Sequence, residues 1–424
     1  MTELLIDGEW VLAEGADAHG LIDPTSRKLL EMIQCASVVQ RQRALTAARR
    51  ALEDWEPRSS GDRTALVQAI VEEIRQAAGA LAERQAIESG QPLRECQDLV
   101  ASTIRRLRSP VEPDNGPPGV QVRQLPRHAL WPFWDAALKS IASGSTLVCE
   151  LPANRALAAL AIARCGQKLP PGVLNVVTVE MQSAESQAAA DATEFVFVGQ
   201  DADLHVAVAG AAALRLYNTG QRPGQSARIH VEAPVAYRFA DRLHEYLAFL
   251  EAGDPRKAVT DLGPLHSEAA LQEAVQQIGG ALKQGALVKL GGRQYQPWGL
   301  TGYFLQPTLL IEGAGVERAP HESISGPVVV VSPTADIGTA LRESVGAAHP
   351  PLRVTVFSSQ MQKVERSLRA ASFAPRAGVY TPLADRGWKS RHEPSDATSA
   401  IEVESVQEPQ LDWFPYGNRR GMKL

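Results

Sequence analysis

Cysteine and histidine are scarce in this chain and do not cluster. Four cysteines stand singly among 424 residues without a C-x-x-C pair, and the nine histidines form no H-x-x-x-H or H-E-x-x-H spacing. Disulfide frameworks and structural zinc sites need such clusters, so we expect neither, and we expect no metal site. Cys149 and Cys165 lie in apolar stretches and are interpreted as small core residues.

The chain also lacks long apolar runs and blocks of basic residues. Its longest apolar run, Ala156 to Ala163, is far shorter than the roughly 20 residues that cross a bilayer. The 43 Lys and Arg against 48 Asp and Glu give a net charge of −5, whereas phosphate recognition needs clustered cations. We therefore expect neither a membrane nor nucleic acid as a partner. Acidic residues near the N-terminus, where a secretory signal would carry Lys or Arg, predict a cytoplasmic protein.

The sequence shows two patterns typical of globular proteins, helical periodicity in its first part and alternating strands and helices after it. Apolar residues recur at steps of three and four from Asp62 to Ser89, which predicts a helix with Ser59 and Gly90 at its ends. A Pro-rich linker, Ser109 to Gly119, follows a further helix. Beyond it, short β-branched runs alternate with Ala-rich helical segments, which predicts βαβ units and a parallel sheet.

These patterns predict two α/β domains and a tail. Strands of the first sheet are predicted at Val120–Leu125, Thr146–Cys149, Leu174–Val179 and Phe195–Val198. A second series of helices and strands begins near Asp201, and an irregular tail with one strand at Ala400–Val403 ends the chain. We set the domain boundaries at 1–216, 217–400 and 401–424.

The segment from Asn218 to Arg228 resembles the nucleophile loop of the aldehyde dehydrogenase superfamily, where N-x-G-Q-x-C is followed five residues later by Arg. Asn218, Gly220 and Gln221 match this motif. Other segments match in the family's order: Leu5–Trp10, Gly90–Pro92, Ala142–Thr146, Leu169–Val177, Asp201–Leu204, Gly253–Pro255 and Gly326–Val328. The resemblance extends to about Tyr380 and implies a Rossmann-type parallel-sheet domain followed by a second, catalytic-type α/β domain.

The residues that perform the family's chemistry are replaced. In the family, a Cys thiolate attacks the aldehyde, and its backbone N–H and an Asn side chain hold the oxyanion. The Cys position is Pro223, which has neither a thiol nor an N–H, and the Asn position is His128. The E-L-G-G motif, which carries the general base, has no counterpart before Asp201, so we interpret it as deleted. Ser226 as a nucleophile and His128 as an acid or base are alternatives that we interpret as structural.

The family's cofactor contacts are also replaced. A Lys that reaches the adenosine ribose corresponds to Glu150, an acid facing a ligand with a diphosphate. The F-T-G-S-x-x-x-G turn is reduced to Gly199, with Leu204 at its second glycine. Ser323 and Ser325 replace the Glu and Phe that contact the nicotinamide ribose. We therefore expect no cofactor, or NAD or NADP if the chain has kept an activity.

The segments that build the family's oligomerisation arms are predicted to be missing or shortened. Too few residues lie between Pro92 and Gly119 for the protruding hairpin, and the tail from Pro415 leaves little for the last arm strand. We therefore do not expect the usual homotetramer.

The leading hypothesis is a pseudoenzyme, a catalytically inactive aldehyde dehydrogenase homologue. It would act as a binding or scaffolding subunit in a hetero-complex with an active aldehyde dehydrogenase or another enzyme of its pathway. Two alternatives stay open. One is a residual NAD(P)-dependent aldehyde oxidoreductase, or other chemistry in the old pocket. The other is a small-molecule sensor.

Overall fold

The structure is a computed structural model that describes residues 2–108, 117–125, 130–180, 193–222, 225–313, 324–340, 352–360, 375–378 and 401–405. The chain divides into two compact units, Met1–Gln187 and Ala188–Leu424. This division lies before the boundary predicted between residues 216 and 217, so residues 188–216 group with the second unit. Within the described ranges, no helix is long and apolar enough to span a membrane.

The first unit is built on a five-stranded sheet in the order β2-β1-β7-β6-β5. Its strands are β1 (Glu3–Ile6), β2 (Glu9–Leu12), β5 (Val120–Gln124), β6 (Thr146–Pro152) and β7 (Leu174–Val179). β5, β6 and β7 run parallel, whereas β1 and β2 form an antiparallel hairpin that pairs with β7. A separate hairpin, β3 (Ala18–Ile22) and β4 (Leu29–Gln34), packs on the short helix η1 (Ala153–Arg155) after β6.

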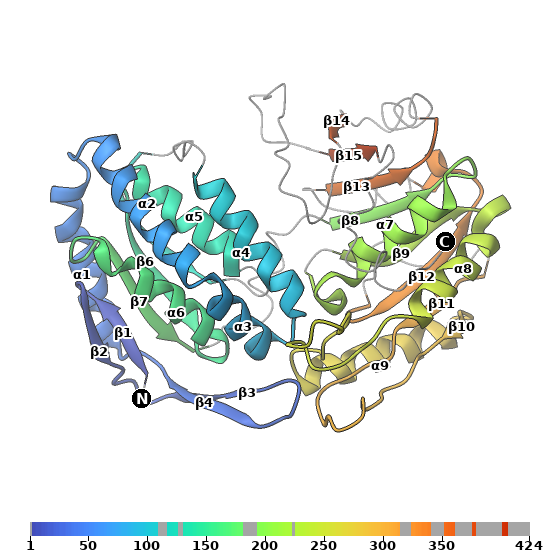
Figure 1. Ribbon diagram of the computed structural model, residues 1–424, viewed down its shortest axis with the longest axis horizontal. Coiled ribbons are helices and arrows are strands. Elements are labelled where there is room, and N and C mark those ends of the chain that lie inside the picture. Colours follow the sequence, from blue (N-terminus) through green and yellow to red (C-terminus); the bar gives the residue numbers. More distant parts are fainter. Residues whose placement is uncertain are drawn as a thin grey trace. The chain divides into compact units, whose positions relative to one another are not determined.

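Helices cover both faces of this sheet (Figure 1). They are α1 (Val38–Trp55), α2 (Ser60–Gln76), α3 (Ala78–Ser89), α4 (Leu93–Arg108), α5 (Leu130–Ala142) and α6 (Leu157–Cys165). Ala44 and Ala48 of α1 pack with Val148 and Val177 on one face. Helices α2 to α6 build the larger core on the other face.

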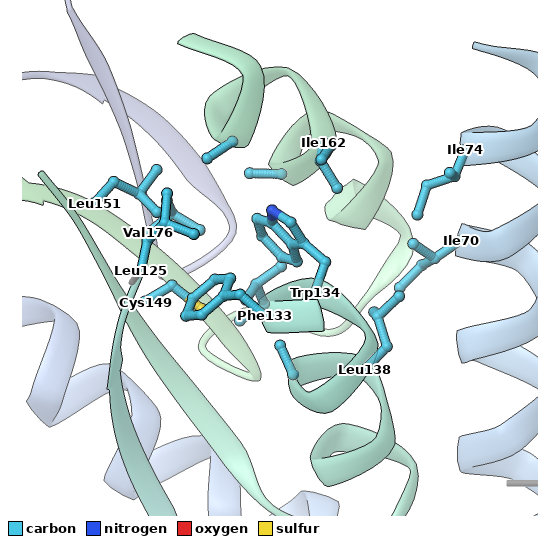
Figure 2. Close-up of a cluster of buried hydrophobic side chains, with 14 of the residues drawn as sticks. Ile70, Ile74, Leu125, Phe133, Trp134, Leu138, Cys149, Leu151, Ile162 and Val176 are labelled. Carbon is cyan, nitrogen blue, oxygen red and sulfur yellow. The ribbon is translucent and has the colours of Figure 1, made fainter. Parts of the chain in front are cut away.

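Aromatic side chains of α5 form the centre of that larger core (Figure 2). The rings of Phe133 and Trp134 meet edge to face, with centroids 5.6 Å apart, and Figure 2 shows Phe133 beside Cys149 of β6. Trp131 is buried as well, and its Nε1 donates to Gln85 Oε1 at 2.6 Å. Cys149 is therefore a core residue, as its apolar surroundings in the sequence predicted.

The helix predicted over residues 62–89 is interrupted in the structure. At Ala77 the backbone leaves the helical conformation, with φ −87° and ψ 0°, and separates α2 from α3. The predicted ends are confirmed: Ser59 Oγ accepts the N–H of Asp62 at 3.1 Å, and Gly90 ends α3 with a φ of 76°. The apolar stripe continues on both sides of the break, so periodicity alone could not locate it.

The second unit contains an eight-stranded sheet in the order β10-β11-β12-β9-β8-β13-β15-β14. Its strands are β8 (Thr193–Val198), β9 (Gln225–Glu232), β10 (Leu287–Leu290), β11 (Thr308–Ile311), β12 (Val328–Thr334), β13 (Leu352–Phe357), β14 (Pro375–Gly378) and β15 (Ile401–Ser405). All are parallel except β10. Helices α7 (Leu204–Leu216) and α8 (Ala233–Ala248) pack on one face, and α9 (Glu268–Lys283) packs on the other.

One strand lies in a different sheet from the one predicted. We expected Phe195–Val198 in the first sheet, and this is wrong, because β8 pairs with β9 and β13 of the second sheet. Residues 194–198 are all buried, and such a run fits any central strand of a parallel sheet. Composition therefore could not choose between the two sheets. The strand expected at 400–403 forms β15.

A buried carboxylate joins two helices of the first unit. Glu88, in the last turn of α3, accepts the N–H of Ala158 at the start of α6 at 2.7 Å. Its Oε1 is buried and has no hydrogen-bond partner in the described part of the chain. Burial raises the pKa of Glu88 to about 7, although Arg155 and Arg84 lower it. The folded protein therefore holds this proton more tightly than the unfolded chain does.

This raised pKa predicts how stability depends on pH. The contribution of Glu88 is complete below pH 4.5 and is lost as the pH rises through about 7. Glu88→Gln stays neutral and keeps an acceptor for Ala158. The free energy of unfolding of this variant should therefore gain on the wild type between pH 5 and pH 8, by up to about 3 kcal/mol. Urea unfolding across this range measures the difference, and parallel curves would contradict the assignment.

Candidate functional site

The predicted nucleophile loop connects α7 to β9 through the short helix η4 (Tyr217–Gly220). Asn218, Thr219 and Gly220 have consecutive positive φ angles of 53°, 55° and 70°. A β-branched residue is rare in this left-handed region, so Thr219 carries backbone strain that its contacts must offset.

Two side chains of this loop form hydrogen bonds with residues 263–266. Thr219 Oγ1 accepts the N–H of Gly263 at 3.0 Å and donates to its carbonyl oxygen at 3.3 Å. Gln221 Oε1 accepts the N–H of His266 at 2.8 Å and lies 2.9 Å from His266 Nδ1. Gln221 Nε2 donates to the carbonyl of Pro264 at 3.4 Å. Thr219 and Gln221 are both buried, so these contacts hold the loop from within.

Arg215, in the last turn of α7, fastens the loop to a second segment, residues 324–326. Arg215 is only 2% exposed to solvent. The guanidinium donates to the carbonyl oxygens of Gly220 and Gly326, each at 2.9 Å, and to that of Ile324. The N–H of Gly326 also donates to the Gly220 carbonyl at 3.2 Å. One buried cation therefore joins two loops through three carbonyl oxygens.

Two cations near the loop interact with the carboxylate of Glu194. Burial lowers the pKa of Arg215 to about 10, and the nearby carboxylate of Glu194 raises it in part, so Arg215 stays protonated at neutral pH. Glu194 also accepts from Arg222, which follows Gln221. Two cations thus face one carboxylate.

The titratable side chains of β9 are engaged in structural contacts: Glu232 accepts the N–H of Gln200 at 2.8 Å and that of Ile337 at 3.2 Å. His230 stacks on Phe197, with ring centroids 5.0 Å apart. Burial, and then Arg228, lower the pKa of His230 to about 3, so the imidazole is uncharged at neutral pH. Ser226 is buried, and its Oγ accepts the N–H of Arg228 at 3.2 Å.

The structure brings some of the predicted site residues together. Asn218, Gly220 and Gln221 lie in the loop, and Ser325 lies in the segment that Arg215 contacts, with its N–H donating to Gln277 Oε1 of α9 at 3.0 Å. Three further predicted positions lie outside the described residues: His128, Pro223 and Ser323.

Glu150 and Gly199, two predicted cofactor positions, do not share a sheet. Glu150 lies in β6 of the first unit, whereas Gly199 follows β8 of the second. The N–H of Gly199 donates to the carbonyl of Phe357 at 2.9 Å, and a Cβ on Gly199 would lie 2.7 Å from Asp201 Oδ1. Asp201 in turn accepts the N–H of Ser359 at 2.7 Å. Gly199 is thus a close-packing position beside β13.

Sequence reasoning missed two residues that shape this site. Arg215 has a signal that could have found it, because it is a lone charge in the apolar stretch Ala211–Leu216 directly before the motif. His266 carries no comparable signal. Only the fold brings it to Gln221.

The family is decided by comparison with known proteins. The profile of the aldehyde dehydrogenase family matches residues 10–113 and 185–377. The chain belongs to the aldehyde dehydrogenase family. It is 25% identical over 389 residues to the succinate-semialdehyde dehydrogenase [NADP(+)] GabD of Escherichia coli, covering 77% of this chain and 79% of that protein. It is 26% identical over 387 residues to the 3,6-anhydro-alpha-L-galactose dehydrogenase of a Vibrio species, covering 78% of this chain and 81% of that protein.

Solved aldehyde dehydrogenase structures have the same fold. An aldehyde dehydrogenase from Bartonella henselae superposes with a TM-score of 0.78 at 18% identity, covering 96% of this chain and 92% of that one. The lactaldehyde dehydrogenase of Escherichia coli gives 0.77 at 21% identity, covering 88% and 89%. The predicted fold class, a Rossmann-like parallel-sheet domain with a second sheet domain, is confirmed.

The parallel strands of the first sheet make half of a dinucleotide-binding fold. In a doubly wound sheet of order 3-2-1-4-5-6, the dinucleotide lies where the order reverses, between strands 1 and 4. β7-β6-β5 corresponds to 3-2-1, and among the described residues no strand pairs with the outer side of β5. Only residues 180–192 separate β7 from β8.

The thiols of this aldehyde dehydrogenase homologue all lie in the first unit, away from the loop in sequence. Cys35, Cys96 and Cys149 are buried, and Cys165 is half-buried. Burial raises the pKa of all four thiols, to about 12 for Cys149. Since the thiolate is the nucleophile, none of them is activated for attack.

A substitution at Gly220 tests whether the packing of the loop contributes to the stability of the protein. A Cβ there would lie 2.0 Å from the carbonyl oxygen of Gly326 and 2.6 Å from Arg215 Nη1. We expect Gly220→Ala to lower the free energy of unfolding by more than about 2 kcal/mol. Gly279→Ala in α9 is the matched control, because its Cβ would meet nothing within 4 Å. It should raise stability by up to about 1 kcal/mol. Equal unfolding midpoints for the two variants would contradict this account.

Proposed function

We propose that this chain is a non-catalytic member of the aldehyde dehydrogenase family that serves as a binding or scaffolding subunit. The observation that carries the proposal is the residue at the nucleophile position. Asn218, Gly220 and Gln221 place Pro223 where the family's Cys stands. Proline has no nucleophilic atom and no N–H for an oxyanion, so a thioester route cannot begin there.

The surroundings of the loop support the same conclusion. Its side chains are engaged with backbone groups: Gln221 with residues 264–266, Thr219 with Gly263, and Arg215 with three carbonyls. The loop is maintained by structural contacts rather than by catalytic ones.

The residues of the first sheet do not fit NAD or NADP. The crevice that would hold a dinucleotide needs a strand beside β5, and the described residues place none there. Glu150, near the carboxyl end of β6, adds a negative charge where a diphosphate would approach. We therefore derive no hydride transfer for this chain.

The partner that we propose is a catalytically complete aldehyde dehydrogenase. The fold is retained over most of the chain whereas the residues that perform the family's chemistry are replaced, and a shared fold offers surfaces on which a relative can assemble. The profile match on both sides of residues 114–184 supports retention of the family fold.

An activity assay tests the proposal that the chain has no aldehyde dehydrogenase activity. Purified protein with NAD or NADP and a panel of aldehydes should form no reduced cofactor above a boiled control, while Escherichia coli lactaldehyde dehydrogenase provides the positive control. Pro223→Cys should restore no dehydrogenase activity, because the described residues include no strand beside β5 that would complete a dinucleotide crevice. Activity of the wild type above background would end the proposal.

Co-purification tests the scaffolding role. The tagged chain, expressed in its native host, should retain a full-length aldehyde dehydrogenase at constant stoichiometry through affinity and size-exclusion steps. An unrelated protein with the same tag serves as the control and should retain none. Elution of the chain without any aldehyde dehydrogenase would refute this part of the proposal.

A further inference from the structure

The outer edge of β5 is an interior position of the fold that has become an edge. In the order 3-2-1-4, strand 1 has neighbours on both sides, whereas β5 pairs only with β6 among the described residues. An uncovered edge presents a row of N–H and C=O groups to another strand. Val122, at the centre of β5, is 52% exposed.

Two other edge strands, β2 and β10, carry features that discourage such pairing. At the edge strand β2, the carbonyl of Leu12 already accepts from Gln40 Nε2 at 2.6 Å. Edge strand β10 has a bulge and carries Lys289, which pairs with Asp241 at 2.6 Å. Bulges and edge lysines are known protections. β5 has the sequence VQVRQ and a regular register with β6.

We propose that two copies of this chain associate through their β5 strands, which pair antiparallel about a twofold axis at Val122. This inference concerns a second copy and does not rest on the proposed function. It follows from the direction of the backbone groups and from the order of the side chains along the strand.

The backbone of β5 fits this pairing. Gly119 accepts from Thr146, and Leu125 donates to Glu150, so the odd-numbered residues face β6. Because backbone groups alternate along a strand, the N–H and C=O of Val120, Val122 and Gln124 point outward. With the axis at Val122, the two central valines exchange both hydrogen bonds, and each Val120 does the same with Gln124 of the other copy.

The side chains fit the same register. Gln121 would lie opposite Arg123 of the second copy, so no like charges oppose each other. An axis at Arg123 would place two guanidinium groups opposite each other, and an axis at Gln121 would pair fewer residues. Within one chain, Arg123 Nε already donates to Gln121 Oε1 at 2.9 Å, so these two groups are compatible neighbours. The two exposed Val122 side chains would cover each other.

The molar mass in solution is the first test. By light scattering after size exclusion, the wild type and the control variant Val122→Thr should give twice the 45.7 kDa of one chain. Val122→Pro should give the mass of one chain, because it removes the central outward N–H and spares the ladder to β6. A wild type with the mass of one chain at micromolar concentrations would overturn the proposal.

Variants with opposite charges at residue 122 test the position of the twofold axis. Val122→Lys and Val122→Glu each place like charges opposite each other, so each variant alone should have the mass of one chain. Mixed in equal amounts, they should restore twice that mass. A far-UV circular dichroism spectrum that matches the wild type confirms the fold of each variant, because loss of association by itself can shift thermal unfolding. Variants that stay dimeric, or that fail to pair when mixed, would overturn the twofold at Val122.

A disulfide between two copies of a cysteine variant tests whether the two β5 strands lie side by side. In a hydrogen-bonded antiparallel pair the Cα atoms are about 5.5 Å apart, within reach of a disulfide. Val122→Cys should therefore give a covalent dimer on mild oxidation. Leu12→Cys, on the opposite edge of the same sheet and equally exposed at 51%, should not. Equal crosslinking of the two variants, or none at Val122→Cys, would count against the proposal.

Discussion

The guanidinium of Arg215 and its three carbonyl partners hold together the part of the second unit where the family's chemistry would begin. A buried cation is costly unless its donors are satisfied, and here the acceptors come from two separate loops. Removing the cation would leave the carbonyls of Gly220, Ile324 and Gly326 without this donor. The strained backbone at Thr219 depends on the same set of contacts, because the loop can keep its left-handed turn only while both flanking segments hold it.

These structural contacts account for Gly220 and Gln221 of the motif without any catalytic role. Gly220 is required by its φ angle and by the carbonyl of Gly326 that would meet any Cβ. Gln221 is required by the backbone of residues 264–266. Neither requirement involves a thiol. A match to N-x-G-Q in a sequence therefore indicates how the loop folds, and only the residue two positions after Gln221 indicates whether it can attack an aldehyde.

The sequence allowed the fold class and the location of the loop to be predicted, because short motifs in a fixed order identify a family even at low identity. Helix ends such as Ser59 and Gly90 were predicted from their caps. The sheet assignment of Phe195–Val198 failed because a fully buried strand carries no alternation that marks its neighbours. Arg215 was missed because its partners are backbone carbonyls, which no side-chain pattern records. Its contact with residues 324–326 exists only after the second sheet has folded.

The outer edge of β5 bears on both proposals. A strand next to β5 would complete the crevice for a dinucleotide and would also bind the outward backbone groups of Val120, Val122 and Gln124. The described residues include no such strand, so the same position would lack a cofactor crevice and offer a regular edge. β5 keeps the composition of a strand with two neighbours, since neither lysine, proline nor a bulge protects it. The physical requirement to satisfy those groups then falls on water or on another strand, and a second β5 meets it with a register that opposes no like charges.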